Sequence, residues 1–258
     1  MKNQSLGERI KEYEFIYTNQ KLINKIPVII RVDGSAFHTL TKKMEKPYDE
    51  RFQNCMRETA KFLCEKIQCT KIAYVQSDEV SLLLHNLDSI NTQIWFNNEI
   101  QKITSHAASL ATYKFILSYI NNFLIDKENE HVANFFSIRD IPPISFDAKV
   151  FQLPVEEVCN YFIFRQQDAA RNSIQSYAQS MFSHKELQNK DNNELQEIMF
   201  QKSGFNWNDA LTKNKRGVCC IKEKYFIEGT QTERSRWVVD QQIPKFTENR
   251  NYIEQYLL

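Results

Sequence analysis

The chain has 258 residues, 42% of them hydrophobic, and its 33 basic and 32 acidic side chains leave a net charge of +1. A chain of this length can bury a large core, but its balanced charge gives no global signature of nucleic-acid binding, which would need local basic patches. No apolar run approaches the ~20 residues of a membrane span, and the N-terminal segment lacks the apolar stretch of a secretory signal. We therefore expect an intracellular, cytoplasmic protein without membrane contact.

The first 153 residues alternate between strand-like and helix-like patterns. Strands are predicted where β-branched residues run between turn residues, and helices where apolar residues recur every three or four positions. In chain order these elements are a strand at 27–32, a helix at 51–67, strands at 71–75 and 80–85, a helix at 93–116 and a strand at 145–153. This β-α-β-β-α-β order is that of the ferredoxin-like fold, which predicts an α+β protein.

Residues 154–258 are predicted to form a helical and β-hairpin extension, which packs on the core of residues 1–153 to give one compact unit. Pro154 opens a helix over 155–183, and Gly204 closes another over 192–203. The late apolar runs at 217–221 and 237–239 predict a hairpin pair. The stretch 126–140 is predicted to be a surface loop.

Three carboxylates are expected to meet at one edge of the predicted sheet. Asp33 ends the first strand, while Asp78 and Glu79 lie in the hairpin between the second and third strands. In the β-α-β-β-α-β topology the first strand ends at the same edge as that hairpin. Carboxylate oxygens are ligands that Mg²⁺ prefers, and two such ions can catalyse an in-line displacement at phosphorus. The alternative is that both motifs are only polar turn residues.

Basic residues supply candidates for phosphate binding. The loop after the first strand carries Lys42, Lys43 and Lys46, and the long helix carries Lys102. Lysines near a metal-binding edge could hold a triphosphate, although most lysines are simply solvated. The second half offers candidates for a phosphate-backbone track, namely Arg165, Arg171, Lys213, Lys215, Arg216, Arg234 and Arg236. The five glycines cannot build a Walker-type or Rossmann phosphate loop.

Five segments together resemble the tRNA-His guanylyltransferases and their guanylyltransferase-like relatives. They are RVDGSAFH at 31–38, KPYD at 46–49, AYVQSDEVS at 73–81, SFDAKV at 145–150 and FRQQDAARNS at 164–173. The resemblance implies a palm-like catalytic core that works in the direction opposite to ordinary polymerases. It also implies two Mg²⁺ ions, ATP and GTP or other nucleoside triphosphates as substrates, a tRNA acceptor and a homotetramer.

The resemblance carries roles onto individual residues. The metal-binding positions fall on Asp33, the Gly34 carbonyl and Asp78, and Glu79 completes the catalytic carboxylates. Nucleotide-binding positions fall on His38, Lys46, Asp49, Ser77 and Lys102. Positions expected to bind tRNA are Arg165, Gln166, Arg171, Asn172, Lys215 and Arg216, the last two on the strength of their charge.

One departure from the family pattern predicts the branch. The guanylyltransferases proper carry His-Ile-Asn where this chain has Ala170, Arg171 and Asn172. The chain therefore resembles the branch that rebuilds truncated tRNA 5′ ends against the opposite strand. A dedicated tRNA-His guanylyltransferase is the alternative within the class, and a nucleotide cyclase or a non-catalytic RNA-binding protein are alternatives from other classes.

Overall fold

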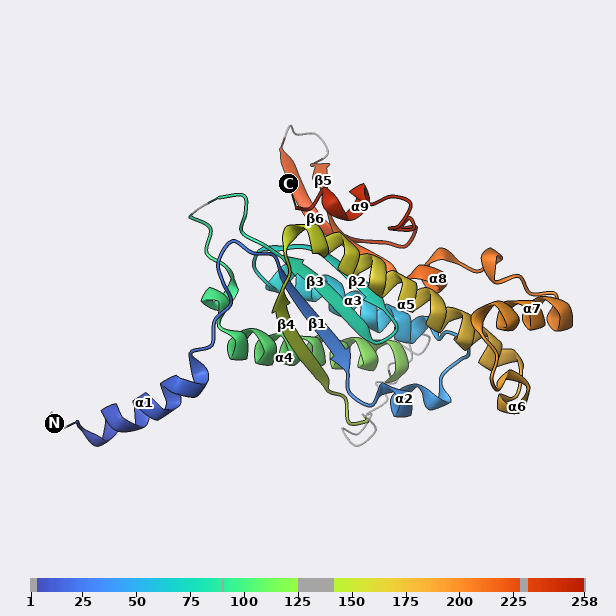
Figure 1. Cartoon of the computed structure of the whole chain (residues 1–258), viewed down its shortest axis with the longest axis horizontal. Helices are drawn as coiled ribbons and strands as arrows, with labels where there is room; N and C mark the ends of the chain where they lie inside the picture. Colours follow the sequence, from blue (N-terminus) through green and yellow to red (C-terminus); the bar gives the residue numbers. More distant parts are fainter. Residues whose placement is uncertain (1–3, 90, 125–141, 228–231, 258) are drawn as a thin grey trace, which may run out of the picture.

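A computed structural model describes residues 4–89, 91–124, 142–227 and 232–257 (Figure 1). Within these residues six strands form one antiparallel sheet in the order β4-β1-β3-β2-β5-β6. The strands are β1 (Val28–Gly34), β2 (Thr70–Gln76), β3 (Glu79–Leu84), β4 (Phe146–Gln152), β5 (Val218–Phe226) and β6 (Glu233–Asp240). The first four have the ferredoxin-like order that the sequence predicted.

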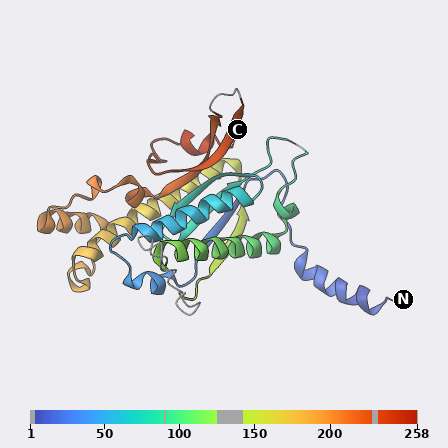
Figure 2. The same cartoon turned by 180° about the vertical axis from the view of Figure 1, so that it is seen from behind.

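Helices cover both faces of this sheet. The principal ones are α3 (Glu50–Lys66), α4 (Ile100–Tyr119) and the 27-residue α5 (Val155–Met181). The others are α1 (Leu6–Thr18), α2 (Phe37–Leu40), α6 (His184–Leu187), α7 (Asn192–Ser203), α8 (Thr212–Arg216) and α9 (Asn251–Glu254). Helix α5 crosses the face seen in Figure 1, whereas α3 and α4 cover the opposite face, seen in Figure 2.

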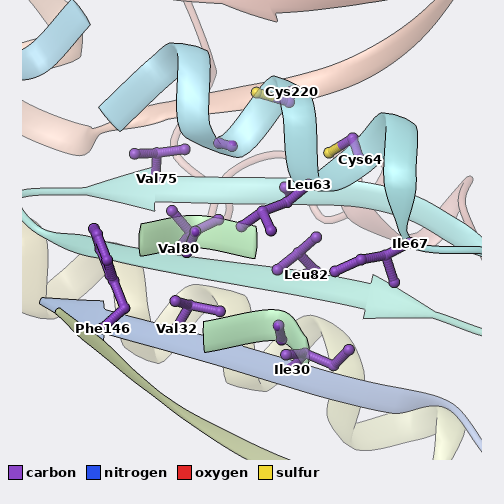
Figure 3. Close-up of a cluster of buried hydrophobic side chains, with 14 of the residues drawn as sticks. Ile30, Val32, Leu63, Cys64, Ile67, Val75, Val80, Leu82, Phe146 and Cys220 are labelled. Atoms are coloured by element: carbon purple, nitrogen blue, oxygen red, sulfur yellow. The ribbon is translucent and has the colours of Figure 1, made fainter. Parts of the chain in front are cut away.

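The core is divided between the two faces by the alternation of side chains along each strand. Val28, Ile30 and Val32 of β1 belong to the cluster beneath α3 and α4, while Ile29 belongs to the cluster beneath α5. Figure 3 shows Leu63 of α3 among the strand residues of the first cluster. Because both faces are covered, the strand reads as a continuous apolar run, which made it recognisable from the sequence.

The C-terminal hairpin extends the core sheet itself. Strand β5 pairs with β2, with Val75 opposite Val218, and β6 then pairs with β5. Gly217 makes this junction possible, because its φ is 76° and a Cβ there would lie 2.3 Å from the Val75 carbonyl oxygen. The sequence predicted the hairpin but not its pairing with β2. The division of the chain at residue 153 stays a prediction.

One helix begins well after its predicted start, and another helix was not predicted. Helix α4 begins at Ile100 and not at 93, because Phe96 and Asn97 have φ of 48° and 50° and break the helix before it. Helix α1 was not predicted, although Ser5 and Glu8 form a capping box at its start. The predicted loop at 126–140 lies outside the described residues. None of the described helices is long and apolar enough to cross a membrane.

Candidate active site

A row of carboxylates crosses three neighbouring strands at one end of the sheet. Asp33 of β1 lies opposite Glu79 of β3 on one side and opposite Asp147 of β4 on the other. Residues directly opposite one another project from the same face of a sheet, so the three side chains share the α5 face. The topology thus brings Asp33 to the Asp78-Glu79 hairpin as predicted. The sequence analysis missed Asp147, because a strand pattern does not reveal its register with another strand.

The turn between β2 and β3 is joined to the end of β1. The Gly34 amide donates a hydrogen bond of 3.1 Å to the Asp78 carbonyl oxygen, and Ser77 has a left-handed φ of 48°. A Cβ on Gly34 would lie 2.5 Å from the Phe37 ring, so only glycine lets that buried ring approach. These contacts fix the backbone on which Asp33 and Asp78 are carried.

The charge at this edge is only partly compensated. Burial, followed by the negative charges of Asp78, Glu79 and Asp147, raises the pKa of Asp33 to about 6, against a lowering effect of Arg31. A bound cation would relieve this repulsion. In the described part of the chain, no three His, Cys, Asp or Glu side chains are gathered closely enough to hold a metal ion. The donor set of Asp33, Asp78 and the Gly34 carbonyl, two carboxylates and a carbonyl of the kind that Mg²⁺ accepts, stays a prediction.

Within this row, the carboxylate of Glu79 is bonded to helix α5. Its two carboxylate oxygens accept hydrogen bonds from Nε and Nη2 of Arg165, at 2.8 and 2.5 Å. The side chains of Glu79 and Arg165 are only 8% and 10% exposed. Sequence reasoning placed Glu79 with the other two carboxylates and Arg165 with the tRNA, and the structure pairs these two residues with each other.

A cavity of about 390 Å³ reaches the β2–β3 turn at Ser77, the residue before Asp78, although its lining includes none of Asp33, Asp78, Glu79 and Asp147. It lies between the loop at 41–49, helices α3, α5 and α8, and the β2–β3 turn, and its volume is in the range of small-molecule sites. Phe52, Met56 and Val75 give it apolar walls. Its lining also includes Lys46, Asp49, Ser77 and Asn172, four of the residues that the sequence analysis assigned to substrate binding.

The residues predicted to bind nucleotide differ in their freedom to do so. Ser77 and His38 are exposed, and His38 lies on α2 just after Gly34. Lys46 is exposed, and its Nζ donates to the Thr41 carbonyl oxygen at 3.1 Å. Asp49 is the buried N-cap of α3. Burial by itself would raise the pKa of Asp49, but hydrogen bonds from Arg51 and the Glu45 amide lower it overall.

Lys102 is not brought to the carboxylate edge within this chain. It lies in the first turn of α4, where the Ile100 amide bonds to the Gln20 carbonyl oxygen ahead of β1. The carboxylate row lies at the far end of β1, near the Phe146 amide that donates to Thr112 of α4. The ten residues from Lys102 to Thr112 span about 15 Å of helix. Lys102 instead pairs with Glu99 at 2.7 Å.

The predicted tRNA-binding residues divide into exposed and buried groups. Arg171 and Asn172 are exposed on α5, where Arg171 pairs with Asp168. Gln166 is buried and its amide bonds to the backbone of Pro244 and Phe246, so it fastens the C-terminal segment to α5. Lys215 is buried, and its Nζ bonds to the Asn208 carbonyl oxygen. Burial and the neighbouring Arg216 charge lower the pKa of Lys215.

Arg216 itself is half-buried, and its carbonyl oxygen accepts a hydrogen bond of 2.6 Å from the Tyr74 hydroxyl. Of the residues predicted to bind tRNA, Arg171 and Asn172 are thus the exposed ones. Arg165, Gln166 and Lys215 are occupied inside the protein.

A palm-like sheet with acidic residues at one edge, next to a cavity of nucleoside size, is the architecture of a nucleotidyltransferase, and this chain is one. The family model described as tRNAHis guanylyltransferase matches residues 7–154, and the chain belongs to that family.

Similar proteins extend over almost the whole chain. A bacterial tRNA(His) guanylyltransferase (Thg1)-like protein in complex with ATP is 40% identical, with a TM-score of 0.87 over 98% of this chain and 99% of that one. A bacterial protein of the same description in complex with GTP is 38% identical, with a TM-score of 0.77 and the same coverage. The tRNA(His) guanylyltransferase of Schizosaccharomyces pombe is 28% identical over 90% of this chain and 85% of its own length.

Proposed function

We propose that this nucleotidyltransferase adds nucleotides to the 5′ end of tRNA in the 3′–5′ direction, directed by the opposite strand, and so repairs truncated 5′ ends. The observation that carries the proposal is the carboxylate edge at Asp33 and Asp78 beside the 390 Å³ cavity. The 40% and 38% identical proteins in complex with ATP and GTP support nucleoside triphosphates as the ligands. The tRNA(His) named for the relatives supports tRNA as the acceptor.

Mg²⁺ fits the donor set of this edge. Asp33, Asp78 and the Gly34 carbonyl would hold it, and the raised pKa of Asp33 is what an uncompensated cation site produces. When bound, such ions lower the charge cost of attack and departure at a phosphorus atom. We propose two ions, as the resemblance implies.

The chain's own residues would bind and orient the reactants. Lys46, at the mouth of the cavity, would hold triphosphate oxygens as a positive point charge. Ser77 presents an exposed hydroxyl one residue before Asp78, and Asn172 faces the cavity from α5. Arg171, exposed on α5, would contact phosphates of the tRNA.

The proposed reaction consists of two displacements at phosphorus. An oxygen of the tRNA 5′-monophosphate first attacks the α-phosphorus of ATP and releases pyrophosphate. The 3′-hydroxyl of the incoming nucleoside triphosphate then attacks the tRNA 5′ phosphorus, loses its proton and releases AMP. Each step needs its attacking oxygen and its leaving group held in line with the phosphorus, so the protein contributes mainly positioning and charge compensation.

Two residues of α5 support repair over histidine-specific guanylylation. Ala170 offers only a methyl group and can make no side-chain hydrogen bond to a base edge. Arg171 at the next position favours phosphate or stacking contacts, which are largely indifferent to base identity. Selectivity would then come from pairing with the template strand.

The experiment uses 5′-labelled tRNAs with Mg²⁺ and all four triphosphates. Wild type should extend truncated tRNAs of several identities by template-matched nucleotides and slow once the acceptor stem is complete. Asp33→Ala and Asp78→Ala should lose addition by at least about 10²-fold, as expected when charge compensation at phosphorus is removed. Near-wild-type rates in either variant at saturating Mg²⁺ would contradict the site.

Two other outcomes would assign a different function. Efficient addition of a single G to full-length tRNA(His) alone would favour a dedicated tRNA(His) guanylyltransferase. A cyclic nucleotide formed from triphosphate in the absence of tRNA would favour a cyclase.

A homotetramer is proposed for the assembly. Helix α1 supports self-association, since it stands away from the body of the molecule (Figures 1 and 2) and buries none of its residues within the chain. Leu6, Ile10, Tyr13 and Tyr17 on one stripe of this helix are 49–71% exposed. Light scattering after size exclusion should give four times the mass of one chain, and deletion of residues 1–18 tests whether α1 takes part.

A further inference from the structure

Arg165 of α5 is bonded to the carboxylate end of the sheet through two of the three nitrogens of its guanidinium. Nε and Nη2 donate to the two oxygens of Glu79, and Nη1 lies 3.4 Å from an Asp168 oxygen. A guanidinium that binds a carboxylate with two parallel hydrogen bonds fixes both the position and the orientation of that carboxylate. The side chain is also only 10% exposed, so little of it can reach a phosphate at the surface.

The surroundings of Glu79 hold its carboxylate in this one direction. The Ser81 hydroxyl lies 3.3 Å from Oε1 and is itself 2.8 Å from the Tyr161 hydroxyl of α5. Arg31 Nε, which is buried and has no hydrogen-bond partner among the described residues, lies 3.9 Å from Oε2. The Glu79 carboxylate therefore has two arginines and a serine hydroxyl around it. For Asp33 in the same row, Arg31 is the positive charge that lowers the pKa.

The consequence concerns the neighbours of Glu79. Glu79 follows Asp78 directly and lies opposite Asp33 across the β1–β3 pairing. A carboxylate at Glu79 that lost Arg165 would keep only Arg31, 3.9 Å away, and the Ser81 hydroxyl as partners beside the negative charges of Asp33 and Asp78. It could then turn toward a bound cation and change how that cation is held.

We propose that Arg165 is a positioning residue for nucleotidyl transfer, which holds the Glu79 carboxylate on α5 and so keeps the donor set to Asp33, Asp78 and Gly34. This proposal rests on the proposed function of the same site. It replaces the expected contact of Arg165 with tRNA by a contact inside the protein, and it leaves tRNA contact to Arg171, six residues further along α5.

The test compares Arg165→Gln and Arg165→Lys with Arg171→Ala, an exposed arginine of the same helix. Arg165→Gln should lower kcat for nucleotide addition about 10–100-fold, as is usual when a residue that orients a metal-binding set is lost. Its KM for tRNA should stay within about twofold. Arg171→Ala should instead raise KM for tRNA and leave kcat nearly unchanged, because it removes a contact that is already made in the ground state. Arg165→Lys keeps the charge but not the two parallel bonds, so it should restore only part of kcat.

Action through Glu79 is tested by the double variant Glu79→Gln/Arg165→Gln. If Arg165 works only by holding Glu79, the double variant should match Glu79→Gln within about twofold, since residues acting as a unit are not additive. The double variant also removes both buried charges, so it keeps the test valid if Arg165→Gln alone fails to fold. If the losses of the two single variants multiplied in the double variant, the proposal would be overturned. A raised KM for tRNA with unchanged kcat in Arg165→Gln would also overturn it.

A measurement without turnover separates this proposal from the proposed function. Mg²⁺ should raise the unfolding temperature of wild type and Arg171→Ala equally, and the half-saturating Mg²⁺ concentration should shift by at least about threefold in Arg165→Gln. An unchanged Mg²⁺ response in Arg165→Gln would overturn the positioning role. If wild type adds no nucleotide to any tRNA but the Mg²⁺ response depends on Arg165, the proposed function fails and the positioning role stands.

Discussion

Replacement of Asp33 by asparagine should stabilise the metal-free protein while removing its response to Mg²⁺. Asp33 lies in a row with Glu79 and Asp147, and burial together with the charges of Asp78, Glu79 and Asp147 raises its pKa to about 6 from an ordinary value of 3.8. Asparagine has nearly the same shape but cannot ionise. The substitution therefore removes the repulsion and one metal ligand at the same time.

The magnitude and the pH window follow from this pKa. The difference between 3.8 and about 6 would be worth about 3 kcal/mol at full strength. Because Asp33 is only partly buried and water screens its neighbours, we discount this to about 1–1.5 kcal/mol. The folded state binds the Asp33 proton more tightly than the unfolded state does. The cost of ionisation is therefore absent below pH 3.8, grows as pH rises through about 6 and is complete above it.

Thermal unfolding in EDTA measures this effect. At pH 8, Asp33→Asn should unfold about 2–6 °C above wild type, given the usual relation between stability and melting temperature for chains of this size. At pH 5 the gain should be about half as large. Mg²⁺ should then stabilise wild type but not the variant. Asp209→Asn, at an exposed carboxylate outside the row, is the matched control and should leave both properties unchanged.

An Asp33→Asn protein that is no more stable than wild type at pH 8 in EDTA would refute the charge repulsion at this edge. Equal stabilisation of both proteins by Mg²⁺ would refute Asp33 as a metal ligand.

Three further changes test other parts of the site. Asp147→Asn should stabilise the metal-free protein less than Asp33→Asn does, since Asp147 contributes less to the raised pKa of Asp33 than burial, Asp78 and Glu79 do. Thermal unfolding in EDTA at pH 8 measures this, and a larger gain in stability than that of Asp33→Asn would contradict it. Gly34→Ala should lower the free energy of unfolding by about 1–3 kcal/mol, because its Cβ would meet the ring of Phe37 at 2.5 Å and that ring is packed against other aromatic rings. Urea unfolding measures this loss, and an unchanged midpoint would contradict it. Lys46→Ala should raise KM for the nucleoside triphosphate more than KM for tRNA, because it removes a positive charge that contacts phosphates already bound in the ground state. Steady-state kinetics with each substrate varied measures both values. If neither changed, Lys46 would be a solvated surface lysine without a role in binding.

Much of the fold and part of the site follow from local patterns. The strands of the core are covered by helices on both faces, so they appear in the sequence as short apolar runs between turns. Their order alone selects the ferredoxin-like topology. That topology then brings Asp33 to Asp78 across more than forty intervening residues, because strand direction decides which ends share an edge. The helix at 192–203 was also predicted with correct bounds, since the residues that begin and end it, the N-cap Asp191 and the C-cap Gly204, directly flank it in the sequence.

Other features were decided only by tertiary packing. Whether Glu79 faces a metal or an arginine depends on how α5 is rotated on the sheet, and its partner Arg165 lies 86 residues away. Asp147 joins the carboxylate row through the register of β4 against β1, which no alternation within β4 specifies. Lys102 shares a helix with residues near the site, but the length of that helix carries it to the other end of the sheet. Local sequence thus determined which chemical groups this protein possesses and the edge where its strands place them, whereas burial and long-range pairing, which depend on the whole fold at once, determined which of those groups remain free to meet a substrate.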